Sequence, residues 1–289
     1  MKTGDKKMSK KYTLPFLISS IVFLISFVLF YYTDLKSLTI WTTNIWDTLA
    51  ATGNVRRFYE YSAMNLYRLD HTMVGNDILI YLPWAVWNLP IWALQRFAGL
   101  NILEHFWMVL YSKLFLLAAF FYALYLTKRI ALLLTPDRDE IRHTLFLGAT
   151  SFFTLSSLTY AGQNDVLVII PFLLALYKLM QGHKKSFLCF SALSIALKPF
   201  FAFSFIALVL LKEKNLLKEL AYGCAGCIFL LLQKLLFHGA PKYYESMHYG
   251  PMKDAFGLLL DSSLEFPPAG VSLFVLGLGV TWLLAYLYT

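Results

Sequence analysis

The stretch HTLFLGATSFFTLSSLTYAGQNDVLVIIPFLLALYKLM, residues 143–180, decides the fold because it places a polar turn between two apolar runs. That turn is Gly162-Gln163-Asn164-Asp165. A second break, Lys198-Pro199, interrupts another apolar stretch, residues 186–211. An ionisable or amide side chain at membrane depth costs a few kcal/mol unless it faces protein or water. Both breaks therefore predict a polar pocket at one end of a helix bundle.

The composition of the whole chain is that of a polytopic membrane protein. Of its 289 residues, 58% are hydrophobic and 15% are charged, and the mean hydropathy is +0.60. A soluble domain is about one-half apolar and about one-quarter charged. Apolar windows near the ~20-residue spanning length recur along the chain. The sequence therefore predicts an all-α fold, a single transmembrane helix bundle of about eight spans over residues 1–289.

The first apolar run, residues 13–32, follows a basic N-terminus. It is too long for a typical signal-peptide core, and no small-x-small cleavage motif follows it. We therefore expect an uncleaved first span with the N-terminus in the cytoplasm. The lysines that support this orientation are Lys2, Lys6, Lys7, Lys10 and Lys11.

The stretch 77–97 fits either a span or an interfacial helix, because it is long enough to cross but rich in tryptophan, which prefers the headgroup region. The positive-inside rule decides between the two. With 77–97 on the outer surface, the later basic loops lie in the cytoplasm with the N-terminus, and with 77–97 as a span they lie outside. These basic residues are Lys128, Arg129, Arg138, Arg142, Lys184, Lys185, Lys212, Lys214 and Lys218.

This choice fixes the remaining topology. Residues 33–104 form one long outer loop that carries juxtamembrane helices, and residues 238–269 form a second outer loop. The stretch 186–211 is too long for one straight span and has lysines at both ends, so it must go out and return near Lys198-Pro199. The chain stops at Thr289, where the last span ends, so a short natural protein and a C-terminally truncated longer one both remain open. The other spans are 105–127, 143–161, 165–180, 217–237 and 270–288.

In this topology, polar side chains from separate segments converge on the outer face. Cations beside carboxylates at headgroup level suit a lipid phosphate as ligand, and a nearby carboxylate suits deprotonation of a hydroxyl acceptor. A lysine buried within a span needs an anionic partner. The converging residues are Asp47, Arg57, Asp70 and Asp77 in the first outer loop, Gln163, Asn164 and Asp165 in the turn, Lys198 at the re-entrant break, and Lys113 about two helical turns into the span 105–127.

The layout resembles the GT-C superfamily of membrane glycosyltransferases, which take sugar from a polyprenyl- or dolichyl-phosphate carrier. The matching pieces are Trp46-Asp47, the helix with Pro83 and Pro90, the Gly162–Asp165 turn, and Ala196-Leu197-Lys198-Pro199-Phe200. The last two pieces resemble the branch that contains bacterial polyprenyl-phosphate mannosyltransferases and the eukaryotic glucosyl- and mannosyltransferases of lipid-linked oligosaccharide and anchor synthesis. Members of the family usually carry further spans beyond this length.

The resemblance implies a hexosyltransferase that moves sugar from a polyprenyl-phosphate donor to a hydroxyl of a glycan or lipid-linked acceptor. It implies an active site on the outer face of a bacterial plasma membrane, and no cofactor is expected. The residues that it implies are Asp47 as base with Asp70 and Asp77 as alternatives, Lys198 on the carrier phosphate with Lys113 or Arg57 sharing the charge, and Gln163, Asn164 and Asp165 lining the sugar or phosphate pocket.

Several of these residues also have a purely structural interpretation. Asp47 could cap a helix that starts there, the turn at Asp165 could cap the next span, and Lys198 could extend to the interface. The histidines His71, His238 and His248 lack the spacing of a helical metal site, so no metal site is expected, although paired carboxylates could still recruit one.

Two other functions for a chain of this kind remain open. A flippase for lipid-linked sugars needs a pathway across the bilayer and usually two repeat halves, and the sequence shows no internal repeat. A polymerase of surface polysaccharide would depend on Arg57 or His71. The net charge of +8 belongs to loops beside the spans, so membrane lipid, and not nucleic acid, is the expected partner.

Overall fold

A computed structural model describes residues 5–29, 33–64, 74–75, 77–102, 104–151, 165–210, 213–247 and 273–288. Over these ranges the chain is α-helical, apart from turns and short 3-10 segments, and it contains no strand. The all-α fold class is therefore confirmed. Apolar helices that satisfy their own backbone hydrogen bonds are the expected solution for a sequence of this hydropathy.

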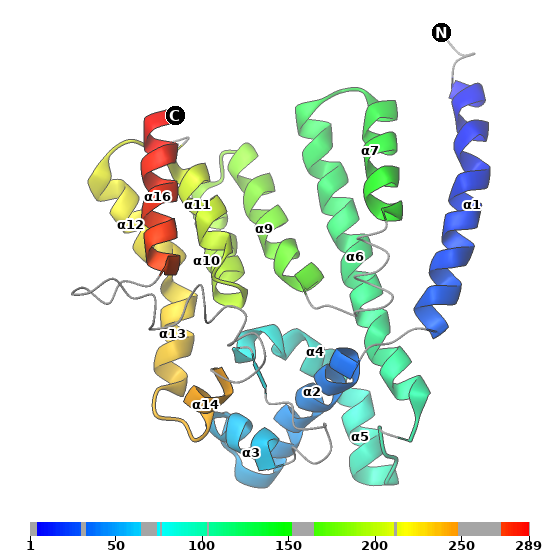
Figure 1. Cartoon of the computed structure of the whole chain (residues 1–289), viewed down its shortest axis with the longest axis vertical. Helices are drawn as coiled ribbons and strands as arrows, with labels where there is room; N and C mark the ends of the chain where they lie inside the picture. Colours follow the sequence, from blue (N-terminus) through cyan, green and yellow to red (C-terminus); the bar gives the residue numbers. More distant parts are fainter. Residues whose placement is uncertain are drawn as a thin grey trace.

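The helices form a bundle and, at one end of it, a layer of shorter helices (Figure 1). The layer contains α2 (Thr33–Thr52), η1 (Val55–Arg57), α3 (Phe58–Met64), η3 (Ile78–Ile80), α4 (Leu82–Trp87), α5 (Leu89–Ala98) and α14 (Tyr243–Met247). The bundle contains α1 (Asp5–Leu29), α6 (Phe106–Leu134), α7 (Arg138–Thr150), α9 (Asp165–Met180), α10 (Lys184–Leu197), α11 (Phe201–Leu210), α12 (Leu216–Gly226), α13 (Ile228–Phe237) and α16 (Leu273–Tyr288).

A large hydrophobic core joins the layer to the bundle. It includes the fully buried Phe58, Tyr81 and Trp84 from the layer, and Leu116 from α6. The same core receives Val168 from the second turn of α9. Because this core buries aromatic and aliphatic side chains from both parts, it fixes the layer against the ends of the bundle helices.

The helices α10 and α11 form a hairpin around Lys198-Pro199. The ring centroids of Phe187 in α10 and Phe205 in α11 lie 5.7 Å apart, whereas a continuous helix would separate these positions by roughly 27 Å. Lys198 has extended backbone, with φ −152° and ψ 107°, as expected before a proline, because proline disfavours the helical conformation of the residue that precedes it. The predicted reversal of the chain at Lys198-Pro199 is therefore confirmed.

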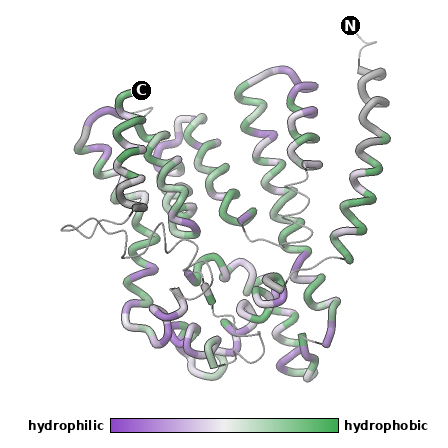
Figure 2. Tube along the Cα trace, viewed as in Figure 1, coloured by the Kyte–Doolittle hydropathy of each residue, from purple (hydrophilic) through white to green (hydrophobic). Residues whose placement is uncertain are grey.

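The basic connections lie at the end of the bundle opposite the layer. Figure 1 places the α6–α7, α9–α10 and α11–α12 connections there, and Figure 2 shows hydrophilic stretches at the same end. These connections carry basic residues used to assign the topology, among them Arg138, Lys184 and Lys214. A common end for these loops is what the positive-inside argument requires.

The number of spans differs from the prediction of about eight. Among the described residues, one helix, α6, is long and apolar enough to cross a membrane alone. The number rises to three if two bent pairs each count as one span, namely Ile78–Trp87 with Leu89–Ala98, bent by 66°, and Leu217–Gly226 with Ile228–Phe237, bent by 46°.

The shortfall has a geometric cause. The helix α9 has 16 residues, α10 has 14 and α11 has 10. At ~1.5 Å per residue, even α9 extends only about 24 Å, against a hydrocarbon core of ~30 Å. Parts of the predicted spans 13–32, 143–161 and 270–288 lie outside the described residues.

Candidate functional site

Asp165 and Lys198 form an ion pair where the ends of α9 and α10 meet. The Nζ atom of Lys198 lies 2.5 Å from Oδ1 of Asp165. Both side chains are accessible, with exposed fractions of 40% for Lys198 and 42% for Asp165. Asp165 of the polar turn and Lys198 of the re-entrant break, 33 positions apart in the sequence, are thus brought together as expected. A half-exposed cation of this kind is open to an anionic ligand.

Local sequence explains the position of both charges. Asp165 is the first residue of α9, where a carboxylate interacts favourably with the helix dipole. Pro199 cannot continue α10, so the helix ends at Leu197 and the backbone N–H of Lys198 donates to Ser194 O at 2.9 Å. The antiparallel packing of α9 and α10 then sets the two side chains face to face.

Asp47 lies inside the layer, in the second half of α2. Its Oδ1 accepts a hydrogen bond of 2.9 Å from the indole Nε1 of Trp92 in α5. The preceding Trp46 donates to Ala85 O in α4 at 2.7 Å. Because α2 begins at Thr33, Asp47 does not cap a helix, and that structural interpretation is wrong. The carboxylate is half-buried and oriented by an indole.

Asp77 belongs to a separate cluster with Lys234 and Tyr243. Its Oδ2 lies 2.9 Å from Lys234 Nζ, and its Oδ1 accepts a 2.5 Å hydrogen bond from the Tyr243 hydroxyl. Lys234 Nζ also lies 2.9 Å from that hydroxyl oxygen. Burial, together with the Asp77 carboxylate, raises the pKa of Tyr243 above its usual range. The side chain of Asp77 is only 14% exposed, although that of Lys234 is 46% exposed, so in this cluster the carboxylate, and not the lysine, is more enclosed than in the Asp165–Lys198 pair.

Sequence reasoning did not identify Lys234 or Trp92 as site residues. Lys234 left a signal, because it is a cation inside the apolar run 217–237 and such a residue requires a partner. Nothing in the sequence indicated Trp92, since tryptophans at the membrane interface are common and its contact with Asp47 spans 45 positions.

The remaining predicted cations are engaged elsewhere. Lys113 in α6 is 1% exposed, and its Nζ donates to Phe27 O in α1 at 2.7 Å and lies 4.5 Å from the Phe27 ring centroid. Its ammonium is enclosed at the contact between α1 and α6. Arg57 donates from Nε to Glu60 Oε2 at 2.8 Å. That contact raises the pKa of Arg57 and lowers the pKa of Glu60.

Some predicted positions lie outside the described residues, namely Gln163, Asn164, Asp70 and His71. Within the described ranges, no group of three or more histidine, cysteine, aspartate or glutamate side chains could hold a metal ion. The predicted residues that the structure describes lie in small separate groups, and among these the one direct pair is Asp165 with Lys198.

These groups nevertheless border the same hydrophobic core. Val166, beside Asp165, and Leu197, beside Lys198, pack against it. Ile78, beside Asp77, and Ile45 in α2 are buried within it. The Asp165–Lys198 pair, the Asp77 cluster and Asp47 therefore lie around the junction of layer and bundle.

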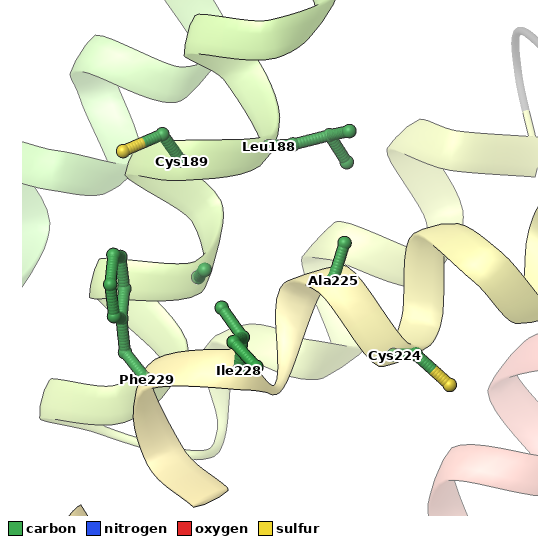
Figure 3. Close-up of a pocket in the computed structure, with 7 residues that line it drawn as sticks. Leu188, Cys189, Cys224, Ala225, Ile228 and Phe229 are labelled. Carbon is green, nitrogen blue, oxygen red and sulfur yellow. The ribbon is translucent and has the colours of Figure 1, made fainter. Parts of the chain in front are cut away.

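A pocket of about 460 Å³ opens between α10 and the bent pair α12–α13 (Figure 3). Its lining is almost entirely carbon and sulfur, and apart from the thiols of Cys189 and Cys224 it offers no group for acid–base chemistry. The lining residue Ala192 lies six positions before Lys198 on α10, about 9 Å along a helix. Residues labelled in Figure 3 are Leu188, Cys189, Cys224, Ala225, Ile228 and Phe229.

Comparisons with known proteins give no match, whether to a family model, to a curated protein or to a solved structure. The function of the chain is therefore inferred from its own residues and their geometry.

Proposed function

We propose that the chain is a membrane glycosyltransferase of the GT-C type, which moves a sugar from a polyprenyl-phosphate donor to a hydroxyl acceptor. The observation that supports this most is the accessible Asp165–Lys198 pair at the junction of layer and bundle. A lysine at headgroup level suits a lipid phosphate. Asp47, a half-buried carboxylate in the adjoining layer, suits the general base.

In this proposal, the acceptor hydroxyl transfers its proton to Asp47 while its oxygen attacks C1 of the donor sugar. The bond between C1 and the phosphate oxygen breaks, and the carrier phosphate leaves with the electron pair. The donor phosphodiester carries one negative charge, whereas a released monoester carries about −1.5 to −2 at pH 7. Lys198 would stabilise the charge that grows on the leaving phosphate, which is the interaction that accelerates such a step.

The other predicted residues keep supporting roles in the proposal. Asp70 remains an alternative base, and Asp77 is a weaker one because Lys234 and Tyr243 already occupy its oxygens. Gln163 and Asn164 would line the sugar or phosphate pocket. Arg57 could share the charge through guanidinium N–H groups other than Nε, which bonds Glu60, whereas Lys113 would have to leave its enclosed position.

We also propose an orientation and a fuller set of spans. The basic loops would face the cytoplasm with the N-terminus, and the layer would lie on the outer face of a bacterial plasma membrane. The helices α1, α7, α9 and α16 and the α10–α11 hairpin would then cross or enter the bilayer beside α6 and α12–α13, giving about eight spans. The polar layer would supply the acceptor side.

The test is transfer of labelled sugar from polyprenyl-phosphate donors by the purified full chain, wild type beside Asp47→Asn. Loss of a general base lowers kcat by about 10²–10⁴-fold, and this is the expected result. The matched control is Asp139→Asn, which removes an exposed carboxylate paired with Arg142 near the opposite end.

The other outcomes discriminate among the alternatives. Turnover that survives Asp47→Asn keeps the reaction class and moves the base to Asp70 or Asp77. No turnover with any donor, in a folded sample that binds the carrier, would contradict the transferase proposal and favour a flippase. Dependence on Arg57 or His71, with Asp47 dispensable, would favour a polymerase.

A further inference from the structure

We infer that Asp165 is an exchange partner for the carrier phosphate on Lys198. The phosphate takes the place of the Asp165 carboxylate when donor binds, and the carboxylate returns to Lys198 when product leaves. This inference rests on the proposed function, which puts a lipid phosphate at Lys198. It adds a competing carboxylate that belongs to the protein itself.

The geometry requires only side chains to move during such an exchange. The backbone at the break is held by hydrogen bonds from Lys198 N to Ser194 O at 2.9 Å and from Phe201 N to Lys198 O at 3.1 Å. The start of α9 is held as well, since Val168 is fully buried and its carbonyl accepts from Ser194 Oγ at 3.4 Å. The backbone is thus held at both residues, while the accessible side chains of Asp165 and Lys198 are the parts that move.

The exposure of the pair makes it exchangeable. An ion pair with both side chains about 40% exposed is solvated on both sides and contributes little net free energy. The donor phosphodiester carries the same single charge as the carboxylate, so on donor binding it replaces a weak contact with a comparable one, whereas the released monoester carries more charge and forms the stronger contact with an ammonium. Displacing Asp165 therefore costs little.

The second lysine–aspartate pair of the region does not meet this condition. Asp77 is 14% exposed, and the Tyr243 hydroxyl bonds it in addition to Lys234. A phosphate approaching Lys234 would have to displace a carboxylate that keeps a second partner and has little water to replace the lost contact. The exchange is therefore assigned to Lys198 and not to Lys234.

The exchange has a use in turnover. After transfer, the released monoester is more negative than the donor and binds a lysine more strongly, which slows product release. A carboxylate that is already within contact distance of Lys198 competes with the monoester at all times. Asp165 would thus weaken product binding and return the site to its starting charge.

The test measures binding of farnesyl phosphate to the detergent-solubilised full chain. We compare wild type, Asp165→Asn, Lys198→Gln and the double variant. Removing the competitor should tighten binding by up to about fivefold, the range that an exposed ion pair allows. Removing the ammonium should weaken binding about tenfold or more. The double variant should match Lys198→Gln, because Asp165 acts only through Lys198.

A charge-matched control is Glu245→Gln. Glu245 pairs with Lys242 at the same end of the molecule, with exposed fractions of 57% and 46%. Its loss changes the net charge as Asp165→Asn does but leaves Lys198 untouched, so affinity should stay at the wild-type value. An equal gain from Glu245→Gln would reduce the effect to general electrostatics and overturn the inference, as would unchanged or weaker binding by Asp165→Asn.

Inorganic phosphate as a second probe identifies the source of the anion. If Asp165→Asn tightens both probes equally, any phosphate headgroup makes the exchange, and if it tightens farnesyl phosphate alone, the lipid carrier does. The fate of the transferase proposal is separate from these results. If Asp165→Asn binds farnesyl phosphate more tightly but no variant transfers sugar, the exchange is supported and the transferase proposal is rejected. If the chain transfers sugar but Asp165→Asn binds as wild type does, the transferase proposal is supported and the exchange is rejected.

Discussion

Two carboxylates at the junction of layer and bundle, Asp47 and Asp77, have unlike surroundings. Asp47 receives one indole hydrogen bond and is half-buried. Asp77 receives an ammonium and a hydroxyl and is nearly enclosed. A carboxylate that must take a proton from a substrate needs an oxygen that the protein does not already use. The surroundings of the two residues therefore favour Asp47 as the base and Asp77 as a structural contact.

Trp92→Phe should lower turnover without weakening donor binding. The change removes the N–H that orients Asp47 and keeps an aromatic ring beside Trp46. Because a misplaced base transfers a proton less well, we expect kcat to fall about tenfold while KM stays near wild type. Steady-state transfer assays measure both constants.

The control for that change is Trp87→Phe. Trp87 also donates its indole N–H, at 3.0 Å, but to the carbonyl of Tyr111 and not to a carboxylate. Trp87→Phe should therefore lose as much stability as Trp92→Phe but keep the wild-type kcat. Equal activity of Trp92→Phe and wild type would remove Trp92 from the positioning of the base.

Tyr243→Phe should destabilise the contact between the layer and α13. The change removes the hydroxyl that bonds Asp77 and Lys234, at a cost of about 1–2 kcal/mol. Thermal unfolding in detergent measures it. Tyr122→Phe, on an exposed ring of α6, should leave the midpoint unchanged.

The same hydroxyl predicts a pH dependence. The pKa of Tyr243 is raised in the folded chain, so the stability contributed by its neutral hydroxyl is fully present below the unfolded pKa of about 10 and is lost as pH rises above it. The wild-type midpoint should therefore fall more steeply above about pH 10 than that of Tyr243→Phe. If the unfolding midpoints of the two proteins fall in parallel as pH rises, ionisation of the Tyr243 hydroxyl does not affect stability, and this prediction is wrong.

At the scale of elements, the sequence predicts where helices break better than which residues they bring together. The hairpin at Lys198-Pro199 follows from length, flanking lysines and proline chemistry, all of them local. The Asp47–Trp92 and Asp77–Tyr243 contacts join positions 45 and 166 residues apart. Such pairings depend on how complete helices pack, and no spacing within one helix encodes them.

Among the described residues, fewer helices than predicted are long enough to span a membrane, for a related reason. Hydropathy windows count apolar residues and do not measure helix length after a break. The stretch 186–211 forms two helices of 14 and 10 residues, each shorter than a full span, and the predicted span 217–237 forms a bent pair. The bend in 217–237 lies beside Gly226, a residue type at which helices kink, and a hydropathy window does not register such a break.

Gly226→Ala should destabilise the contact between α12 and α11. A Cβ at Gly226 would lie 2.7 Å from Cε1 of Phe205, and that ring is 4% exposed and stacked on Phe187. Because the ring has little room to move, we expect a loss of about 1–3 kcal/mol. The midpoint of thermal unfolding in detergent reports the change.

Gly223→Ala is the matched variant on the same helix. Nothing lies within 4 Å of a Cβ built at Gly223, and alanine is the better helix former by up to ~1 kcal/mol. This variant should be neutral or slightly more stable than wild type. If both alanine variants lose stability equally, backbone effects and not the Phe205 contact would account for the loss.

At the scale of the molecule, the charges divide between two ends. One end carries the basic loops, and the other carries the layer with Asp47, the Asp77 cluster and the Asp165–Lys198 pair. In the proposed orientation, a bilayer between these ends would separate the cytoplasmic face from the proposed catalytic face. The proposed orientation can be measured independently of any activity.

Single cysteines should report opposite sides of the membrane. In a cysteine-free background, Arg138→Cys at the start of α7 and Lys242→Cys beside α14 place thiols at the two ends, where both native side chains are exposed. An impermeant maleimide should label position 242 in right-side-out vesicles and position 138 only in inverted ones. Labelling of both positions in the same vesicles would contradict the topology.

The α10–α11 hairpin also affects how the chain enters a membrane during synthesis. Both of its ends are on the basic side, so in the proposed topology the two helices would insert together with Lys198 leading. A lone lysine passing through hydrocarbon costs about 2.5–3.5 kcal/mol. Asp165 emerges from the ribosome before Lys198 and can meet it as a neutral pair. The ion pair would then lower the cost of inserting Lys198 into the membrane. Variants that leave Lys198 without Asp165 should therefore accumulate less in the membrane.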